Sequence, residues 1–279
     1  MRIVSVYPAA TDILLALGLG AELVAVSERC DLPEGLGSLP RLAGFAGVAP
    51  GRLVDLEPDL VILGGDGGNA ASAEARRILQ VAQPEAELLV LAPASVEGVF
   101  NAISTVGAMT EAEDAAMDVV ERLRERLRAV QEIVMGRRDH GFQPARVVAL
   151  DGLVPPRAVG RWVPDQVRLA GGWELLGRTG GSPGPTTWEA VRDVDPEIVV
   201  LMPEELGLGT ALATWDRVSR PEGWTGIRAV AGGRVFVVDG VPFSRPGPRV
   251  VDGIETLAEL IDPVAFDGMA PPASWAQAR

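Results

Sequence analysis

The first 110 residues alternate between short apolar runs and longer segments with helical spacing. Each apolar run is the length of a buried strand and is rich in Val, Ile and Leu. The strands are predicted at Arg2–Tyr7, Leu23–Ser27, Asp59–Leu63 and Glu87–Leu91. The helices are predicted at Pro8–Leu17, Ala71–Ala82 and Val96–Met109, with a short helical turn at Arg52–Leu56. Strands that alternate with helices indicate βαβ units and a mostly parallel sheet.

A longer helix is predicted from Thr110 to Met135. Thr110 and Glu113 form the S/T-x-x-E pattern of a capping box. Apolar residues then recur at helical spacing as far as Val134. The apolar stripe covers too few heptads to favour a coiled coil, so we interpret this helix as a strut between two lobes.

After this helix the chain repeats the organisation of its first half. Segment 190–201 resembles segment 52–63, and each runs from a short helix through an acidic-Pro-acidic motif into a buried strand. Arg146–Leu150 resembles Arg2–Val6. The repeat predicts an α/β fold of two similar three-layer lobes with mostly parallel sheets, joined by one long α-helix, with a ligand cleft between the lobes. The expected boundaries are 1–109 for the first lobe, 110–136 for the linking helix, 137–262 for the second lobe and 263–279 for a C-terminal tail.

The composition excludes several kinds of chemistry. The formal charge is −13, which argues against a nucleic-acid partner. The chain has no lysine, one histidine (His140) and one cysteine (Cys30). Schiff-base chemistry, Walker-type phosphate loops, internal disulfides and Cys/His zinc sites are therefore excluded. We expect a binding protein without catalytic activity, with Cys30 buried and His140 solvated.

The apolar runs carry no membrane or export signal. No run reaches the roughly 18 residues of a membrane helix, and no charged region or cleavage site precedes Ile3. We therefore expect a cytoplasmic protein without membrane insertion, or an extracytoplasmic one if Met1 was added to a truncated mature protein.

The ordered motifs resemble those of cobalamin-binding proteins in the helical-backbone class of ABC-importer substrate-binding proteins. The first-lobe motifs are Ser5–Asp12, Leu17-Gly18, Cys30–Pro33 and Leu56–Ile62. The second-lobe motifs are Gly160–Asp165, Leu169–Gly172 and Phe243–Arg249. The likeness extends to about Asp262. It implies that cobalamin or a related corrinoid is bound between two lobes with little hinge motion, and the metal needs no protein ligand because cobalamin brings its own lower base.

A corrin is a wide, largely apolar disc with amide arms, which aromatic faces, arginines and loop backbone can bind. The resemblance and the loop positions together give the candidate ligand-binding residues. These are Tyr7, Arg29, Phe45, Asp66, Gly67, Trp162, Phe243 and Arg245. The other tryptophans, assigned to packing, are Trp173, Trp188, Trp215, Trp224 and Trp275.

The resemblance also implies a partner. Importer-type members carry one glutamate on each lobe that pairs with arginines of an ABC permease. Glu189 matches the second-lobe glutamate, whereas the repeat places Gly51 at the first-lobe position. We therefore expect a monomer that does not dock on a permease through two symmetric Glu–Arg contacts. The corresponding hypothesis is a cytoplasmic corrinoid carrier or sensor.

Two alternatives remain open. The same fold could bind a siderophore or another metal chelate, which an arginine-rich cleft would favour. A cytoplasmic α/β enzyme could act from Asp66 or Asp151 at strand ends, although isolated strand-end carboxylates are common in proteins without catalysis.

Overall fold

The computed structural model describes residues 1–43, 55–65, 70–220 and 222–278. The chain divides into two compact units. The N-terminal unit comprises Met1–Pro93 and Phe100–Glu121, and the C-terminal unit comprises Ala94–Val99 and Arg122–Arg279. Among the described residues, none of the helices combines the length and the apolar character that a membrane span requires.

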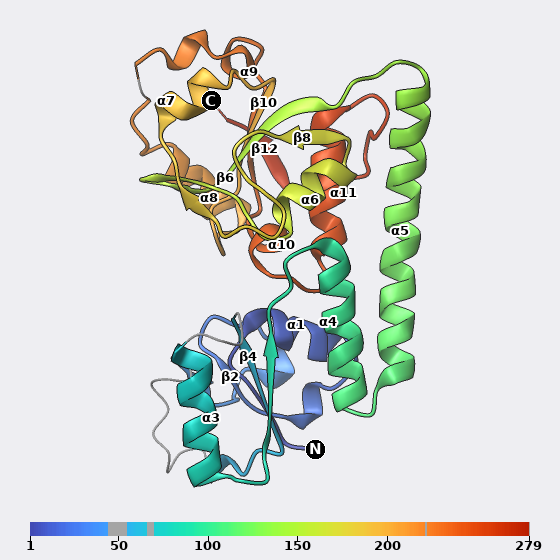
Figure 1. Ribbon diagram of the computed structural model, residues 1–279, viewed down its shortest axis with the longest axis vertical. Coiled ribbons are helices and arrows are strands. Elements are labelled where there is room, and N and C mark those ends of the chain that lie inside the picture. The colour runs from blue at the N-terminus through green and yellow to red at the C-terminus, as the bar shows by residue number, and fades with distance from the viewer. Residues whose placement is uncertain (44–54, 66–69, 221, 279) are drawn as a thin grey trace. The chain divides into compact units, whose positions relative to one another are not determined.

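The N-terminal unit is built on a five-stranded sheet in the order β3-β2-β1-β4-β5, and every pairing is parallel (Figure 1). Its strands are β1 (Ile3–Ser5), β2 (Leu23–Ser27), β3 (Arg41–Leu42), β4 (Leu60–Gly64) and β5 (Glu87–Leu91). Its helical segments are α1 (Pro8–Ala16), η1 (Gly20–Glu22), η2 (Glu34–Leu36), α3 (Ala70–Ala82) and α4 (Val96–Met109), whose first turn belongs to the C-terminal unit. Side chains such as Val4 and Val61 pack against Ile78 and Leu79 of α3, while α1 contacts β1, β2 and β4.

The C-terminal unit contains a seven-stranded mixed sheet. Its order is β12-β11-β10-β6-β7-β9, and β8 pairs with the first part of β6. Strands β8, β6, β10 and β11 are parallel, whereas β7, β9 and β12 are antiparallel additions. The strands are β6 (Ala145–Leu153), β7 (Pro156–Ala158), β8 (Gly172–Glu174), β9 (Gly184–Pro185), β10 (Ile198–Leu201), β11 (Val235–Val238) and β12 (Trp275–Gln277).

Helices cover both faces of this sheet. One face packs against a cluster of three tryptophans, Trp188, Trp215 and Trp224, whose ring centroids lie 5.4–6.1 Å apart. Helices α6 and α11 contact each other, and α6 also contacts β8. The helical segments of this unit are α6 (Val163–Leu169), α7 (Trp188–Asp193), α8 (Leu208–Trp215), η4 (Trp224–Gly226), α9 (Arg228–Ala231), α10 (Val241–Ser244) and α11 (Val250–Ile261). The packing role predicted for the three clustered tryptophans is confirmed.

Helix α5 (Glu113–Asp139) is the long helix that the sequence predicts. Its apolar stripe is buried at Leu123 and Val130. In the C-terminal unit, Arg126 forms ion pairs of 2.7 and 2.5 Å with Asp252 and Glu255 of α11. Charged contacts therefore join this helix to α11.

The internal repeat is visible in matching hydrogen bonds. The backbone N–H of Arg2 donates to Asp59 (2.6 Å), and that of Arg146 donates to Glu197 (2.8 Å). Each arginine side chain also donates to the carbonyl two residues before the proline of the acidic-Pro-acidic motif. The residue before that proline has a positive φ in both units, 43° at Glu57 and 40° at Asp195. The two copies thus share a local structure as well as a sequence pattern.

The fold class is confirmed as two α/β units joined by a long helix, and the bounds of most predicted helices and strands agree within a few residues. The capping box at Thr110 is wrong, because the Thr110 hydroxyl donates back to the Val106 carbonyl (2.7 Å) and α5 begins only at Glu113. Most of the turn expected at 52–56 lies outside the described residues. Segment 263–279, expected as a tail, contains β12, which pairs with β11.

Candidate functional site

A cavity of about 240 Å³ opens in the C-terminal unit where parallel strands end. Asp151 lies near the end of β6, Met202 directly follows β10, and Phe243 is in α10, which follows β11. Loops beyond the carboxyl ends of parallel strands are the usual ligand sites of α/β sheets. The remaining lining residues are Arg157, Gly160, Arg161, Trp162, Val163, Ser182, Pro183, Glu204 and Ser244.

Two loops of the cavity wall are closely joined. The Arg161 N–H donates to the Gly181 carbonyl (2.6 Å), and the Gly180 N–H donates to the Arg161 carbonyl (2.9 Å). A Cβ at Gly160 would lie 2.4 Å from the Gly181 oxygen and 2.5 Å from the Pro183 nitrogen. Only glycine permits this approach, which explains the Gly-Arg-Trp sequence at the start of α6.

Two predicted ligand-contacting aromatics, Trp162 and Phe243, line this cavity. Both are almost fully buried, with exposed fractions of 3% and 4%. The Nε1 of Trp162 is buried without a hydrogen-bond partner among the described residues. Buried donors are nearly always paired in folded proteins, so this unpaired N–H is unusual.

The charges at the cavity neutralise one another. The Arg157 guanidinium lies between Asp151 (2.6 Å) and Glu204 (2.7 Å). Burial raises the pKa of Asp151, although the hydrogen bond from Arg157 acts in the opposite direction. The cavity therefore presents aromatic and polar surface with little net charge, which suits a largely neutral ligand.

Glu174, at the end of β8, holds one loop of the cavity wall. One carboxylate oxygen accepts from the Ala149 N–H in β6 (2.9 Å), and the other accepts from Leu176 and Gly177 (3.0 and 3.1 Å). Burial raises the pKa of Glu174 to about 7, against the lowering effect of these N–H groups. The segment that begins here continues to Ser182 and Pro183, so Glu174 fixes its start, while the backbone bonds to Arg161 hold its end. No sequence motif indicated this role.

In the N-terminal unit, Tyr7 and Arg29 lie at the carboxyl edge of the parallel sheet. Tyr7 follows β1 and packs on Gly64 at the end of β4, where a Cβ would lie 2.5 Å from the ring. Arg29 follows β2 and is exposed. The prediction that Tyr7 stands at the end of the first strand is confirmed.

A chain of buried hydroxyl and thiol groups supports Tyr7. The Cys30 Sγ–H donates to Thr11 (3.2 Å), the Thr11 hydroxyl donates to Ser5 (2.8 Å), and Ser5 donates to the Tyr7 carbonyl (3.2 Å). Cys30 is 4% exposed, as the sequence predicts for a small buried residue. These contacts fix the backbone at the point where β1 turns into α1.

The other predicted residues have different outcomes. Arg245 is buried and binds Glu205 through two contacts of 2.9 and 2.8 Å, and it does not line the cavity. Glu189 is exposed in the first turn of α7, as a docking residue must be. Phe45, Gly51, Asp66 and Gly67 lie outside the described residues. The binding roles stay predictions.

Residues 3–242 match the family described as periplasmic binding protein. The chain belongs to this family. It is 28% identical over 272 residues to an uncharacterized ABC transporter substrate-binding lipoprotein of Bacillus subtilis. The aligned region covers 95% of this chain and 81% of the lipoprotein. The chain is 23% identical to a vitamin B12-binding protein of Vibrio parahaemolyticus over 94% of this chain and 90% of that protein.

Solved structures of periplasmic binding proteins share the fold. A periplasmic vitamin B12-binding protein of Vibrio cholerae has a TM-score of 0.75 at 22% identity and covers 95% of this chain and 98% of its own. A periplasmic heme-binding protein of Pseudomonas aeruginosa has a TM-score of 0.73 at 23% identity, with coverages of 94% and 93%. Members of this family bind substrates rather than transform them, so the chain is not an enzyme.

Metal ligation by the chain finds no support in the described residues. No group of three or more His, Cys, Asp or Glu side chains there could hold a metal ion. His140 is exposed at the end of α5, and its Nδ1 lies 2.7 Å from the Gly136 carbonyl, to which it donates. The solvated position predicted for His140 is confirmed.

Proposed function

We propose that this periplasmic binding protein binds cobalamin or a related corrinoid at the carboxyl edges of its parallel sheets. The observation that carries the proposal is the match to relatives named vitamin B12-binding protein over nearly the whole length of both chains. The cavity in the C-terminal unit supports it, because aromatic surface and little net charge suit an apolar disc with neutral amide arms. At about 240 Å³ this cavity would hold only part of such a ligand.

Trp162 gives the proposal a specific side chain to test. Its indole adds aromatic surface to the cavity, against which the apolar disc of a corrinoid can pack. Phe243 contributes apolar surface to the same cavity, and Ser182 and Ser244 contribute polar groups at its wall.

Heme is the second candidate, because structural neighbours include heme-binding proteins. Heme iron needs an axial ligand from the protein, usually His, Cys, Met or Tyr. Tyr7 stands at a strand end, where a ligand could reach it, whereas His140 is at the end of α5. Cobalamin needs no such residue, so the effect of removing the Tyr7 hydroxyl separates the two ligands.

The experiment is a comparison of visible absorption after incubation with cyanocobalamin or hemin and removal of free ligand by desalting. We expect retained corrinoid colour in both the unmodified protein and Tyr7→Phe. Retention of hemin instead, with a spectrum altered by Tyr7→Phe, would assign the chain to heme. Retention of neither ligand would refute the corrinoid proposal and leave iron chelates as the next class to test.

We further infer that the bound ligand is passed to an ABC permease. A relative named as an ABC transporter lipoprotein supports this, as does the exposed Glu189 on α7. Cell fractionation with co-purification tests it: recovery with a permease supports the receptor role, and Glu189→Gln should weaken that recovery. Recovery in the cytoplasm without a permease would support the carrier or sensor hypothesis instead.

A further inference from the structure

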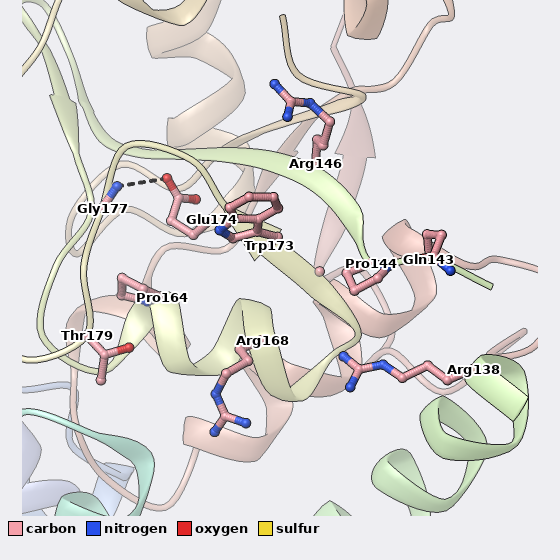
Figure 2. A pocket seen from close by; sticks show the side chains of 11 residues that line it. Arg138, Gln143, Pro144, Arg146, Pro164, Arg168, Trp173, Glu174, Gly177 and Thr179 are labelled. Atoms are coloured by element: carbon pink, nitrogen blue, oxygen red, sulfur yellow. Dashed lines mark hydrogen bonds between the residues drawn. The ribbon is translucent and has the colours of Figure 1, made fainter. Parts of the chain in front are cut away.

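A second cavity of the C-terminal unit, of about 690 Å³, shares no lining residue with the one described above. Its walls come from the end of α5, the start of β6, helix α6 and strand β8 (Figure 2). It therefore lies at the amino end of β6, whereas the first cavity lies at the carboxyl end of that strand. A volume of this size is within the range of small-molecule sites.

Trp173 is the dominant apolar side chain of this second cavity. Its neighbours in β8, Gly172 and Glu174, are buried, while Trp173 is 61% exposed. The alternation of a strand explains why its side chain points to the opposite face. The packing role predicted for Trp173 is wrong, and an indole presented to solvent in a cavity is an available stacking surface.

The same cavity is rich in cations within an acidic chain. Arg138, Arg146 and Arg168 all line it, although the formal charge of the whole chain is −13. Figure 2 shows Trp173 between the guanidinium of Arg146 on one side and those of Arg138 and Arg168 on the other.

Few acidic groups offset these cations. Arg168 pairs with Asp165 (2.6 Å), and the Arg146 guanidinium donates to the Val194 carbonyl. Neither Arg138 nor Arg146 forms an ion pair with an acidic side chain in the described part of the chain. The acidic residue that lines the cavity, Glu174, is buried and occupied by backbone N–H groups. The cavity thus combines an aromatic face with uncompensated positive charge.

We propose that this second cavity binds a small planar aromatic anion, stacked on Trp173 with its acidic group directed to Arg138. Aromatic carboxylates are the ligand class, because the indole supplies a stacking face and guanidinium groups bind carboxylates in the plane of their fork. The proposal does not depend on corrinoid binding, since the two cavities have separate walls.

The test is calorimetry of the full chain with 2-naphthoate as the probe and 2-naphthalenemethanol as an uncharged ligand of similar shape. We expect the carboxylate to bind at sub-millimolar concentration and the alcohol to bind at least roughly tenfold more weakly. A saturating amount of cyanocobalamin should leave the 2-naphthoate affinity unchanged, whether or not cyanocobalamin itself binds.

Variants locate the binding. Trp173→Ala should weaken 2-naphthoate binding by roughly tenfold or more, and Trp173→Phe by less. Arg138→Gln should weaken it several-fold, whereas Arg122→Gln, the same change at an exposed site of the same helix outside the cavity, should not. Thermal unfolding verifies that each variant is folded. We expect all of them to fold, because the side chains of Trp173, Arg138 and Arg122 are exposed.

Three results would overturn the proposal. They are no binding of 2-naphthoate at millimolar concentration, equal binding of the uncharged alcohol, and unchanged affinity in a folded Trp173→Ala variant. Displacement of 2-naphthoate by cyanocobalamin would also contradict it, because the probe would then occupy the corrinoid site.

Discussion

The two cavities of the C-terminal unit differ in the two properties that select a ligand. At the carboxyl end of β6 the aromatics are buried and Arg157 is held between two carboxylates. At the amino end of the same strand Trp173 is exposed and two arginines lack acidic partners in the described part of the chain. The first arrangement favours a neutral, largely apolar ligand and the second an aromatic anion. One sheet thus offers two surfaces of different chemistry.

The largest effect is expected from Trp162→Ala. The sequence alone predicts little loss of fold, but at 3% exposure we expect the free energy of unfolding to fall by about 3–5 kcal/mol. Corrinoid affinity should also fall by roughly ten- to a hundredfold. Trp162→Phe is the matched control: it retains an aromatic ring but removes the unpaired N–H and part of the indole surface. Unchanged affinity in a folded alanine variant would assign Trp162 to packing alone.

Glu174→Gln tests the buried carboxyl that lines the second cavity and binds the backbone at the start of the loop that leads to the first. Glutamine has one acceptor oxygen. Its amide NH₂ group would therefore face a backbone N–H that now donates a hydrogen bond to the carboxylate, and two donors would meet. We expect the free energy of unfolding to fall by about 2–3 kcal/mol in urea titrations. Glu132→Gln, on the exposed side of α5, is the control and should change stability little. A stability equal to that of the unmodified protein would show that Glu174 does not hold the wall.

The pKa of Glu174 predicts a dependence of stability on pH. Burial raises this pKa from 4.5 to about 7, so the folded state retains the proton to a higher pH than the unfolded chain does. Unfolding therefore releases a proton between about pH 4.5 and 7, and the free energy of unfolding falls as the pH rises through this window, by at most about 3 kcal/mol. The difference in the free energy of unfolding between the unmodified protein and Glu174→Gln, measured at each pH, isolates this contribution. A difference that does not vary from pH 5 to 8 would contradict the raised pKa.

The smallest stability effect is expected at Trp173. Its side chain is 61% exposed, so Trp173→Ala should change the free energy of unfolding by less than about 0.5 kcal/mol. The contrast with Trp162→Ala is the sharpest test of the difference between the two cavities. Comparable losses of stability in the two variants would mean that Trp173 packs in solution.

Much of the fold follows from local patterns. Apolar strands and amphipathic helices predict most elements, and the repeat predicts that Arg2 and Arg146 begin equivalent strands, which their matching hydrogen bonds confirm. The capping box failed because Glu111 adopts a positive φ of 55° between α4 and α5. That turn depends on how the two helices pack, which a four-residue motif does not encode.

The site was less predictable, because it depends on contacts between distant segments. Trp173 is exposed because only one face of the three-residue strand β8 is covered by other parts of the chain, and Trp173 points to the other face. The Arg245–Glu205 pair joins residues 40 positions apart, and Glu174 contacts Ala149 across the sheet. The residues that could be located, Tyr7, Arg29, Trp162 and Phe243, are those whose position next to a strand end or a helix start is fixed by local sequence.

Corrinoid binding itself can be measured by calorimetric titration of the full chain with cyanocobalamin. We expect a 1:1 complex that Tyr7→Phe retains, and we expect Trp162→Phe to weaken it by less than Trp162→Ala does. Absence of heat at micromolar concentrations, together with binding of hemin that is lost in Tyr7→Phe, would contradict it.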